Sequence, residues 1–534
     1  MKRVKRTSRW ACMIYAGLWL AGCHGGGGGG TEGATLPLEV LGARGGTLLA
    51  RAGHCPQGAR LVWRDARGTV VADGERVDDP VPDEALTVTA TCGDRRAGAV
   101  LAVRSVFSTS SAFAILREDG TVTAWGSPAA GGDMGGREPR GAIQIAASER
   151  AFAARGRDGG VVAWGDAAAG GDIGRPLSGI AGLYGLHRGF LARGADGRAH
   201  VWGSAIRPFD EDGNQDNLSD VLDAPALDAL RNATHVVSSL GGHAVLKRDG
   251  RVAAFGDAQV GGDVSPVADD LSDVVRLVAT DYSMAALLAD GRAVVWGGVT
   301  DPGVHAGGLS GGVLSLASNS AVHALLHADG SVNVLGVGLL GRGEEISGVR
   351  GRLTAVRRIY ASKTAFAALG HDGRVVGWGD DERIGESFRE VEPRLRDVVS
   401  IASTETSFAA LTRDGRVVTW GEARTGGDSR AVAPELTGVA LLFANDYAFA
   451  ALKTDGTVVT WGAAGEGGDS SSVRGMLRDV RAIHSTPLGG FVAIRRDGTL
   501  VAWGSASAGG VLPRSHASRV PHSVVNSLRS QYRS

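Results

Sequence analysis

The chain has 534 residues, of which 83 are glycine, and its 56 basic and 57 acidic side chains leave a net charge of −1. This balanced charge argues against binding to the phosphate backbone of nucleic acids, which normally requires a basic face. Abundant glycine with only 5% aromatic residues is expected for many short strands joined by tight turns. Composition therefore favours an all-β protein.

Residues 1–23 are predicted to be a targeting signal that lies outside the fold. A basic stretch precedes the apolar run Trp10–Ala21, which is too short to span a bilayer comfortably. The run ends in Leu20-Ala21-Gly22-Cys23, which resembles a bacterial lipobox. The resemblance implies cleavage before Cys23 and its lipidation, and His24 is not the aspartate associated with inner-membrane retention. The alternative is an ordinary signal peptide that contains a cysteine.

Residues 24–34, which include the run Gly25–Gly30, are predicted to be a flexible linker between the anchor and the folded part. Together with the lipobox, the linker implies a lipid-anchored protein of the bacterial cell envelope, attached to the outer membrane if the host has two membranes. Membrane contact would occur through the lipid anchor alone. Whether the protein faces the periplasm or the outside stays open.

Residues 35–104 are predicted to form a small β domain outside the repeats. Cys55 and Cys92 are the cysteines that remain once the signal is removed and Cys23 is lipidated, and in an exported protein they are expected to form one disulfide. With Trp63 between them, the domain resembles a small immunoglobulin-like sandwich, although the cysteine spacing is shorter than in antibody domains. A redox or metal-binding cysteine pair is the alternative. The predicted strands are Leu38–Leu41, Arg60–Arg64, Thr69–Ala72, Leu86–Cys92 and Ala99–Val103.

Residues 105–510 repeat one phrase ten times, and residues 511–534 form a C-terminal tail. The phrase is seen in Phe408–Gly421, where Phe408 precedes Asp414 by six residues and Trp420 follows it by six. A period of about forty residues indicates a repeat architecture. The Asp-Gly pairs begin at residues 119, 158, 196, 249, 290, 329, 372, 414, 455 and 497.

Each unit is predicted to contain three strands and one uncertain segment. In unit 398–438 the strands are Val398–Ser403, Phe408–Thr412 and Arg416–Trp420, and Asp-Gly between two β-rich runs predicts a type I′ hairpin in which both central residues have positive φ. A Gly-Gly-Asp element often follows the Trp-Gly pair. Three or four antiparallel strands in about forty residues fit the blades of a propeller.

The phrase "AALTRDGRVVTWG", preceded by a "V..IAS" strand, resembles the repeat of the regulator-of-chromosome-condensation superfamily. The short period and the Gly-Gly-Asp ending look like its bacterial branch, in which short blades also build a secreted β-lactamase-inhibiting propeller. The resemblance implies a β-propeller of about ten short three- to four-stranded blades, preceded by the small β-sandwich. Ten units exceed the usual seven, so a single large ring, a split ring and an open spiral all stay open. Gly-Gly-Asp also replaces the family's usual Gly-Gln-Leu-Gly.

The order of the strands predicts one uniform face and one varied face. If the first strand runs upward, the turn between the first and second strands lies on top and the Asp-Gly turn lies underneath. The top turns differ between units, and repeat proteins commonly place such variation on a binding face, although solvated turns that tolerate drift are the alternative. The predicted rim residues that bind a partner are Glu149, Arg150, Tyr184, His187, Arg188, Asp281, Tyr282, Lys363, Glu405, Asp446 and Tyr447.

A long step between Asp196 and Asp249 places an acidic insertion on the same face. Gly213 does not fall at the glycine position of an EF-hand loop, and the twelfth position lacks glutamate, so a plain acidic loop is favoured over a calcium site. No other cofactor is expected. The residues that could supply oxygen ligands to Ca²⁺ are Asp210, Asp212, Asn214 and Asp216.

The sequence contains no recognisable catalytic set, so the protein is predicted not to be an enzyme. Gly308–Gly312 matches G-x-S-x-G, but a β-rich run follows Ser310 where a nucleophile elbow needs a helix. The main hypothesis is a monomeric scaffold that binds a protein, and not nucleic acid, through its top turns. The alternatives are an inhibitor of a secreted or periplasmic enzyme, a structural envelope-assembly factor, and an enzyme that uses Ser310.

Overall fold

The computed structural model describes residues 36–53, 55–79, 84–102, 104–205, 216–217, 222, 224–298, 312–336 and 346–513. None of the helices in this part of the chain is both long and apolar enough to cross a membrane. The two α-helices within these ranges are short, α2 (Ala224–Ala229) and α3 (Glu386–Val391). Almost all other regular structure is antiparallel sheet, as expected from the composition.

The N-terminal domain consists of two antiparallel sheets that share one core around the fully buried side chain of Trp63. One sheet contains β1 (Leu38–Leu41), β2 (Thr47–Ala52) and β5 (Arg76–Asp78). The other has the order β4 (Val70–Asp73), β3 (Arg60–Arg64), β6 (Leu86–Cys92) and β7 (Arg95–Leu101). The predicted sandwich architecture is confirmed, while kinship with immunoglobulin domains stays a prediction.

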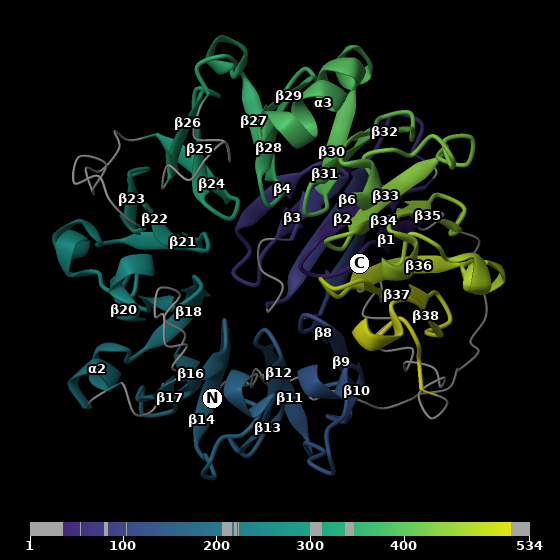
Figure 1. The fold of residues 1–534 in the computed structure, drawn as a ribbon. Coiled ribbons are helices and arrows are strands. Elements are labelled where there is room, and N and C mark those ends of the chain that lie inside the picture. The colour runs from purple at the N-terminus through teal and green to yellow at the C-terminus, as the bar shows by residue number, and fades with distance from the viewer. Residues whose placement is uncertain are drawn as a thin grey trace, which may run out of the picture.

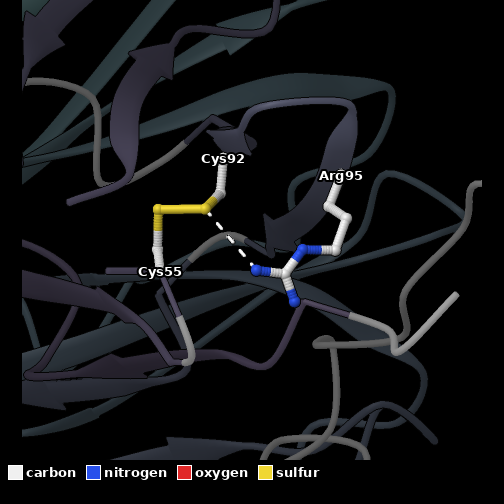
Figure 2. Close-up of a disulfide and its surroundings, with 3 residues drawn as sticks. All are labelled: Cys55, Cys92 and Arg95. Atoms are coloured by element: carbon white, nitrogen blue, oxygen red, sulfur yellow. Dashed lines mark hydrogen bonds between the residues drawn. A yellow bond between two sulfur atoms is a disulfide. The ribbon is translucent and has the colours of Figure 1, made fainter. Parts of the chain in front are cut away.

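Cys55 and Cys92 form the predicted disulfide, with their Cα atoms 5.9 Å apart. The bond joins the segment after β2 to the end of β6 and so links the two sheets, and Nη2 of Arg95 lies 3.6 Å from Sγ of Cys92 (Figure 2). Because the two cysteines are bonded to each other, the structure does not contain the alternative, a redox-active or metal-binding pair.

Two strands of this domain, β2 and β5, were not predicted from the sequence. In β2 the buried residues do not alternate with exposed ones, because Leu48 and Ala50 face the sandwich core while Leu49 packs into a core of the repeat array. A strand that is buried on both faces lacks the period-two pattern by which strands are recognised.

Ten sheets follow, nine with three strands and that of unit three with four, numbered here as units one to ten, and Figure 1 shows them standing round a common centre. The first strands, which lie nearest the centre, are β8 (Val106–Ser108), β11 (Ala142–Ala147), β14 (Ile180–Leu186), β18 (Ala233–Ser238), β21 (Val274–Ala279), β24 (Val313–Ser318), β27 (Val356–Ala361), β30 (Val398–Ser403), β33 (Val439–Ala444) and β36 (Val480–Ser485).

The second and third strands of each unit extend outward from the first (Figure 1). The second strands are β9 (Ala112–Leu116), β12 (Ala151–Gly156), β15 (Gly189–Gly194), β19 (Gly242–Lys247), β22 (Ser283–Leu288), β25 (Val322–His327), β28 (Ala365–Gly370), β31 (Ser407–Thr412), β34 (Ala448–Lys453) and β37 (Gly490–Arg495). The third strands are β10 (Val122–Gly126), β13 (Val161–Gly165), β16 (Ala199–Ala205), β20 (Val252–Gly256), β23 (Ala293–Gly297), β26 (Val332–Gly336), β29 (Val375–Gly379), β32 (Val417–Gly421), β35 (Val458–Gly462) and β38 (Leu500–Gly504).

Among the described residues, the uncertain fourth segment is a strand only in unit three, where β17 (Asp216–Asn217) pairs with β16. In most other units it begins with one turn of 3₁₀ helix, as in η8 (Ala423–Thr425), and a second short helical turn sometimes follows, as in η10 (Ser471–Met476). The connector between β29 and β30 instead contains η6 (Asp381–Gly385), α3 and η7 (Glu392–Arg394).

Phenylalanine and tryptophan of the repeated phrase pair across the second and third strands of one unit. In seven units the two rings stack with centroids 5.1–5.5 Å apart. His243 and His323, which replace phenylalanine, are buried in the same slot, and burial lowers the pKa of each to about 3, so both are neutral packing residues.

The Asp-Gly hairpins differ from the predicted type I′ turn. Only the glycine has positive φ, for example 78° at Gly415, and its N–H donates to the C=O of Thr412. This pattern belongs to longer hairpin loops that end in a left-handed glycine. The aspartate serves a different purpose: in unit two, Oδ1 of Asp158 accepts from the N–H of Gly160, and eight other units repeat this bond.

The underside turns also hold neighbouring units together. The C=O of Gly415 accepts from the N–H of Val439, the first residue of the next unit's first strand, and the corresponding bond recurs around the array. On the outer side, Nε1 of Trp461 donates to the C=O of Gly426 in the preceding unit at 3.0 Å. These bonds make each unit the packing partner of the next.

The two ends of the array meet. Nε1 of Trp125 in unit one donates to the C=O of Gly509, which follows unit ten, at 3.0 Å, and the N–H of Leu488 donates to the C=O of Ser110. Both contacts have the form seen between sequential units. No sheet of the described residues combines strands from both ends, so the array is not closed by a shared sheet. The ten units form one curved β-propeller rather than a split array.

The first glycine of the Gly-Gly-Asp element packs so closely against the neighbouring unit that a side chain would not fit. Gly426 has φ of 99°, and a Cβ atom there would lie 2.6 Å from the ring of Phe449. We expect Gly426→Ala to lower the free energy of unfolding by about 2–3 kcal/mol, because it adds both backbone strain and a clash. Gly465→Ala, in the next such turn, has no atom within 4 Å of its new Cβ and is expected to be neutral. Denaturant titration of both variants tests this, and equal midpoints would contradict it.

The N-terminal domain covers part of the underside (Figure 1). The N–H of Gly42 donates to the C=O of Arg481 near the start of β36, and Leu41 and Leu49 share a core with Leu441 near the start of β33. Ion pairs Glu39–Arg496 and Asp78–Arg358 flank this contact. The domain is therefore docked on the propeller.

Candidate functional site

A buried serine, threonine or asparagine stands at the start of nine top turns, and in five units it also bonds to the segment after the third strand, a feature not predicted from the sequence. In unit four, Oγ of Ser239 accepts from the N–H of Gly242 at 2.9 Å and donates to the C=O of Val260 at 2.7 Å. Such a side chain closes the turn and ties it to the segment after the third strand. The residues at this position, all buried, are Thr109, Ser148, Ser239, Thr280, Asn319, Ser362, Thr404, Asn445 and Thr486, and Leu186 replaces them in unit three. These residues recur at a regular spacing along the chain, so their shared position in the turn could have been predicted from the sequence.

In nine of the ten top turns, a residue just after this position donates a backbone hydrogen bond to the following unit, and His187 of unit three only accepts one. The N–H of Lys363 donates to the C=O of Glu405, and the N–H of Glu405 donates to the C=O of Asp446, at 3.0 and 2.9 Å. The side chains of these turns therefore vary on a backbone that is hydrogen-bonded from unit to unit, except between units three and four. The residues whose N–H groups donate in this way are Ser110, Glu149, Leu240, Asp281, Ser320, Lys363, Glu405, Asp446 and Leu488.

The top turns of units four to ten and unit one surround a polar cavity of about 690 Å³. Four of the predicted rim residues line it: Asp281, Lys363, Glu405 and Asp446. Three carboxylates face one ammonium group, and Nζ of Lys363 pairs with Oε1 of Glu405 at 2.5 Å. The rest of the wall is mainly serine, threonine, asparagine and alanine, so the cavity offers hydrogen-bonding groups around a concentrated charge.

Charges in the cavity alter each other's titration. Burial, together with the charge of Glu405, raises the pKa of Asp446 from 3.8 to about 6. The hydrogen bond to Glu405 raises the pKa of Lys363, which keeps it protonated. At neutral pH the cavity thus holds two adjacent carboxylates in units eight and nine that repel each other, and a bound cationic group would relieve that repulsion.

The raised pKa of Asp446 predicts a pH dependence of stability. Between about pH 4 and 6 the folded protein retains a proton that the unfolded chain has released, so stability falls as pH rises through this window. We expect Asp446→Asn to be more stable than the parent at pH 7, by the order of 1 kcal/mol, and to lose that advantage at pH 4. Denaturant midpoints at the two pH values measure the effect.

Asp455→Asn on the underside is the control. Hydrogen bonds from Thr457 lower the pKa of Asp455, so this substitution should bring no gain at pH 7. The same pH profile for the two variants would contradict the interpretation of Asp446.

The rim residues of units two and three lie outside the cavity wall. Nε of Arg188 approaches Oε2 of Glu149 at 4.0 Å, Arg150 pairs with Asp166 at 3.4 Å, and His187 is half-buried. Tyr282 and Tyr447 are half-buried at the following turn position and do not line the cavity either. The structure therefore groups only four of the eleven predicted residues in one place.

Tyr184 is not a rim residue, which corrects the sequence prediction. It lies within β14, and its hydroxyl donates to the C=O of Ala233, at the start of the next unit, at 2.9 Å. The side chain packs with the core of units three and four. Tyr184 corresponds to Ala402 of unit eight, which lies inside the strand predicted there, so the repeat register already placed this tyrosine in a strand and not in a turn.

Two further predictions concern residues beyond the described part of the chain. Cys23, the predicted lipidation position, lies outside it, as do Asp210, Asp212, Asn214 and Ser310. The backbone of Asp216 is described, in β17. Within the described ranges, no three His, Cys, Asp or Glu side chains are grouped so that they could hold a metal ion.

Comparison with known proteins yields structural likeness alone. No protein-family model and no curated protein matches the chain. The CRINKLY WD40 ectodomain of the Arabidopsis thaliana receptor kinase ACR4 has 16% identity over 51% of this chain and 93% of its own, with a TM-score of 0.29. Prp20p of Saccharomyces cerevisiae has 15% identity over 61% of this chain and 84% of its own, with a TM-score of 0.30. Human WBSCR16 has 19% identity over 57% of this chain and 80% of its own, with a TM-score of 0.26. This chain is a repeat β-propeller, and the statement rests on its own strand pairing and contacts between units.

Proposed function

We propose that this propeller is a lipid-anchored binding scaffold of the bacterial cell envelope, and not an enzyme, and that its top face binds a protein partner. The observation that carries the proposal is the polar cavity whose charged side chains stand on a continuous chain of backbone hydrogen bonds. Binding residues on loops that a rigid scaffold positions are the usual arrangement in such folds.

The place of the N-terminal domain supports this choice of face. Any attachment through residues that precede Leu36 reaches the propeller by way of that domain, which covers part of the underside. The top face is then directed away from the anchor. A partner presenting lysine or arginine would fit the three carboxylates Asp281, Glu405 and Asp446.

Photo-crosslinking in the producing cells tests the proposal. A crosslinking residue at position 447 on the top face should give a protein adduct of discrete mass, and one at Arg374, an exposed position on the underside, should not. Glu405→Ala with Asp446→Ala should abolish the adduct at 447 while leaving the denaturant midpoint unchanged or higher. Adducts from position 374 alone, or no change in the double variant, would reject the top face as the binding surface.

A further inference from the structure

A second cavity, of about 270 Å³, lies where the N-terminal domain meets units one, two and ten. It is separate from the top cavity and shares none of its lining residues. Its walls come from the domain and the segment that leaves it, from the underside turns of units one and two, and from β11, β36 and β37. The lining residues that matter here are Arg44, Arg104, Arg117, Glu118, Ile143, Arg157, Arg481, His484 and Ile494.

The charge of this wall is strongly one-sided. Five arginines and a single carboxylate, Glu118, line the cavity. Asp79, outside the lining, pairs with Arg44 at 2.5 Å and offsets one of the five. Guanidinium groups hold carboxylate and phosphate oxygens through two parallel N–H donors, which makes arginine suited to binding such anions.

The remaining wall is mostly apolar. Val40, Leu101, Leu116, Ile143 and Ile494 all contribute to it. Pockets of about 300–1,000 Å³ with mostly apolar walls and a few converging polar groups are the usual form of small-ligand sites, and this cavity is slightly smaller than that range.

Burial acts on the titratable groups of the cavity. Desolvation lowers the pKa of Arg481 to about 10, and burial next to Arg481 lowers the pKa of His484 to about 4. At neutral pH Arg481 is therefore charged in a setting that disfavours its charge, and His484 is neutral. An anion bound beside Arg481 would add a favourable charge interaction in this desolvated setting.

We propose that this cavity binds a small ligand with one anionic group, a carboxylate or a phosphate, and a short apolar part. The anionic group would contact the guanidinium groups of Arg157 and Arg481, and the apolar part would contact Ile143 and Ile494. Because the walls belong to both the N-terminal domain and the propeller, binding would also strengthen the contact between them.

Titration calorimetry on the purified full chain tests this site with four probes: hexanoate, hexyl phosphate, inorganic phosphate and hexylammonium. We expect hexanoate or hexyl phosphate to bind most tightly, inorganic phosphate to bind more weakly, and hexylammonium not to bind. The tighter of the two hexyl probes identifies the anionic group. Affinity should fall as salt is added, because the attraction is screened.

Matched variants separate the site from general surface charge. Arg157→Gln and Arg481→Gln should each weaken binding roughly tenfold, since each removes a hydrogen bond between charged groups. Arg413→Gln changes the same turn position in unit eight, far from the cavity, and should leave affinity unchanged. Arg157 lies in an exposed turn, so its variant remains informative if Arg481→Gln fails to fold.

The apolar part has its own pair of variants. Ile143→Ala should weaken hexanoate binding and leave inorganic phosphate binding unchanged, while Leu314→Ala, at the same strand position in unit six, should change neither. The proposal is overturned if neither hexyl probe binds at millimolar concentration, if Arg157→Gln and Arg413→Gln have the same effect, or if hexylammonium binds as well as the anions.

Discussion

Replacing Trp420 by alanine is expected to lower the free energy of unfolding by about 3–5 kcal/mol, the range for large aromatic deletions in cores. The side chain is 1% exposed, and its ring stacks on Phe408 with centroids 5.2 Å apart. Phe388 of α3 adds an edge-on contact at 5.7 Å. The deletion would leave a cavity between two neighbouring units, which the surrounding sheets cannot close without moving.

A paired substitution separates packing from hydrogen bonding at this position. Nε1 of Trp461 donates to the C=O of Gly426, whereas Nε1 of Trp420 has no hydrogen-bond partner among the described residues. The connector before unit eight carries α3 in place of a Gly-Gly turn, so the accepting carbonyl is missing there. Trp461→Phe should therefore cost about 1–3 kcal/mol more than Trp420→Phe, because it leaves a buried carbonyl unsatisfied.

Denaturant titration followed by tryptophan fluorescence measures all three variants. A loss below about 1 kcal/mol for Trp420→Ala would mean that the ring is exposed and that the packing between units is wrong. Equal losses for the two phenylalanine variants would mean that the bond from Trp461 to Gly426 contributes nothing to stability.

Removing the disulfide has the second large effect. Cys55→Ser combined with Cys92→Ser should destabilise the N-terminal domain by about 4 kcal/mol, because the bond closes a long loop and restricts the unfolded chain. The two residues are 37 positions apart. A domain of this size has a small core and depends strongly on such a bond.

Arg95→Ala is the matched control for the disulfide. Arg95 touches Sγ of Cys92 at 3.6 Å, so its replacement disturbs the same place and leaves the bond intact (Figure 2). We expect a loss of less than about 0.5 kcal/mol, as is usual for surface substitutions. The transition of the double serine variant should appear as early unfolding of the sandwich, with the propeller transition following. If both variants unfold like the parent, the bond does not stabilise the domain.

Much of the architecture could be predicted because its causes are local and repeated. The period of about forty residues, the Asp-Gly turns and the Phe–Trp pairs predicted ten three-stranded units, and the structure contains them. The pairing of Cys55 with Cys92 followed from counting the cysteines that remained. The type of hairpin was predicted wrongly, since the aspartate before each glycine keeps negative φ and uses its carboxylate to close the turn.

The candidate site was predicted in part. Strand order was enough to place Asp281, Lys363, Glu405 and Asp446 on the varied face, because each unit repeats the same up and down path. It was not enough to show which of the eleven residues share a cavity, since that depends on how far each unit is rotated against the next. Tyr184 shows a separate error: it lies inside the first strand of its unit, and its hydroxyl bonds to the next unit instead of facing the rim.

Sequence alone determined the repeated unit, its strand order, its uniform underside and the disulfide, since each depends on residues close in the chain or on simple counting. Only the tertiary structure decided that the ends of the array meet, that the N-terminal domain docks on the underside, and that five arginines surround one cavity there. Those features join residues hundreds of positions apart, as Trp125 joins Gly509. The pattern within a unit carries no information about such distant contacts, because it is set by packing within that unit and against its immediate neighbours.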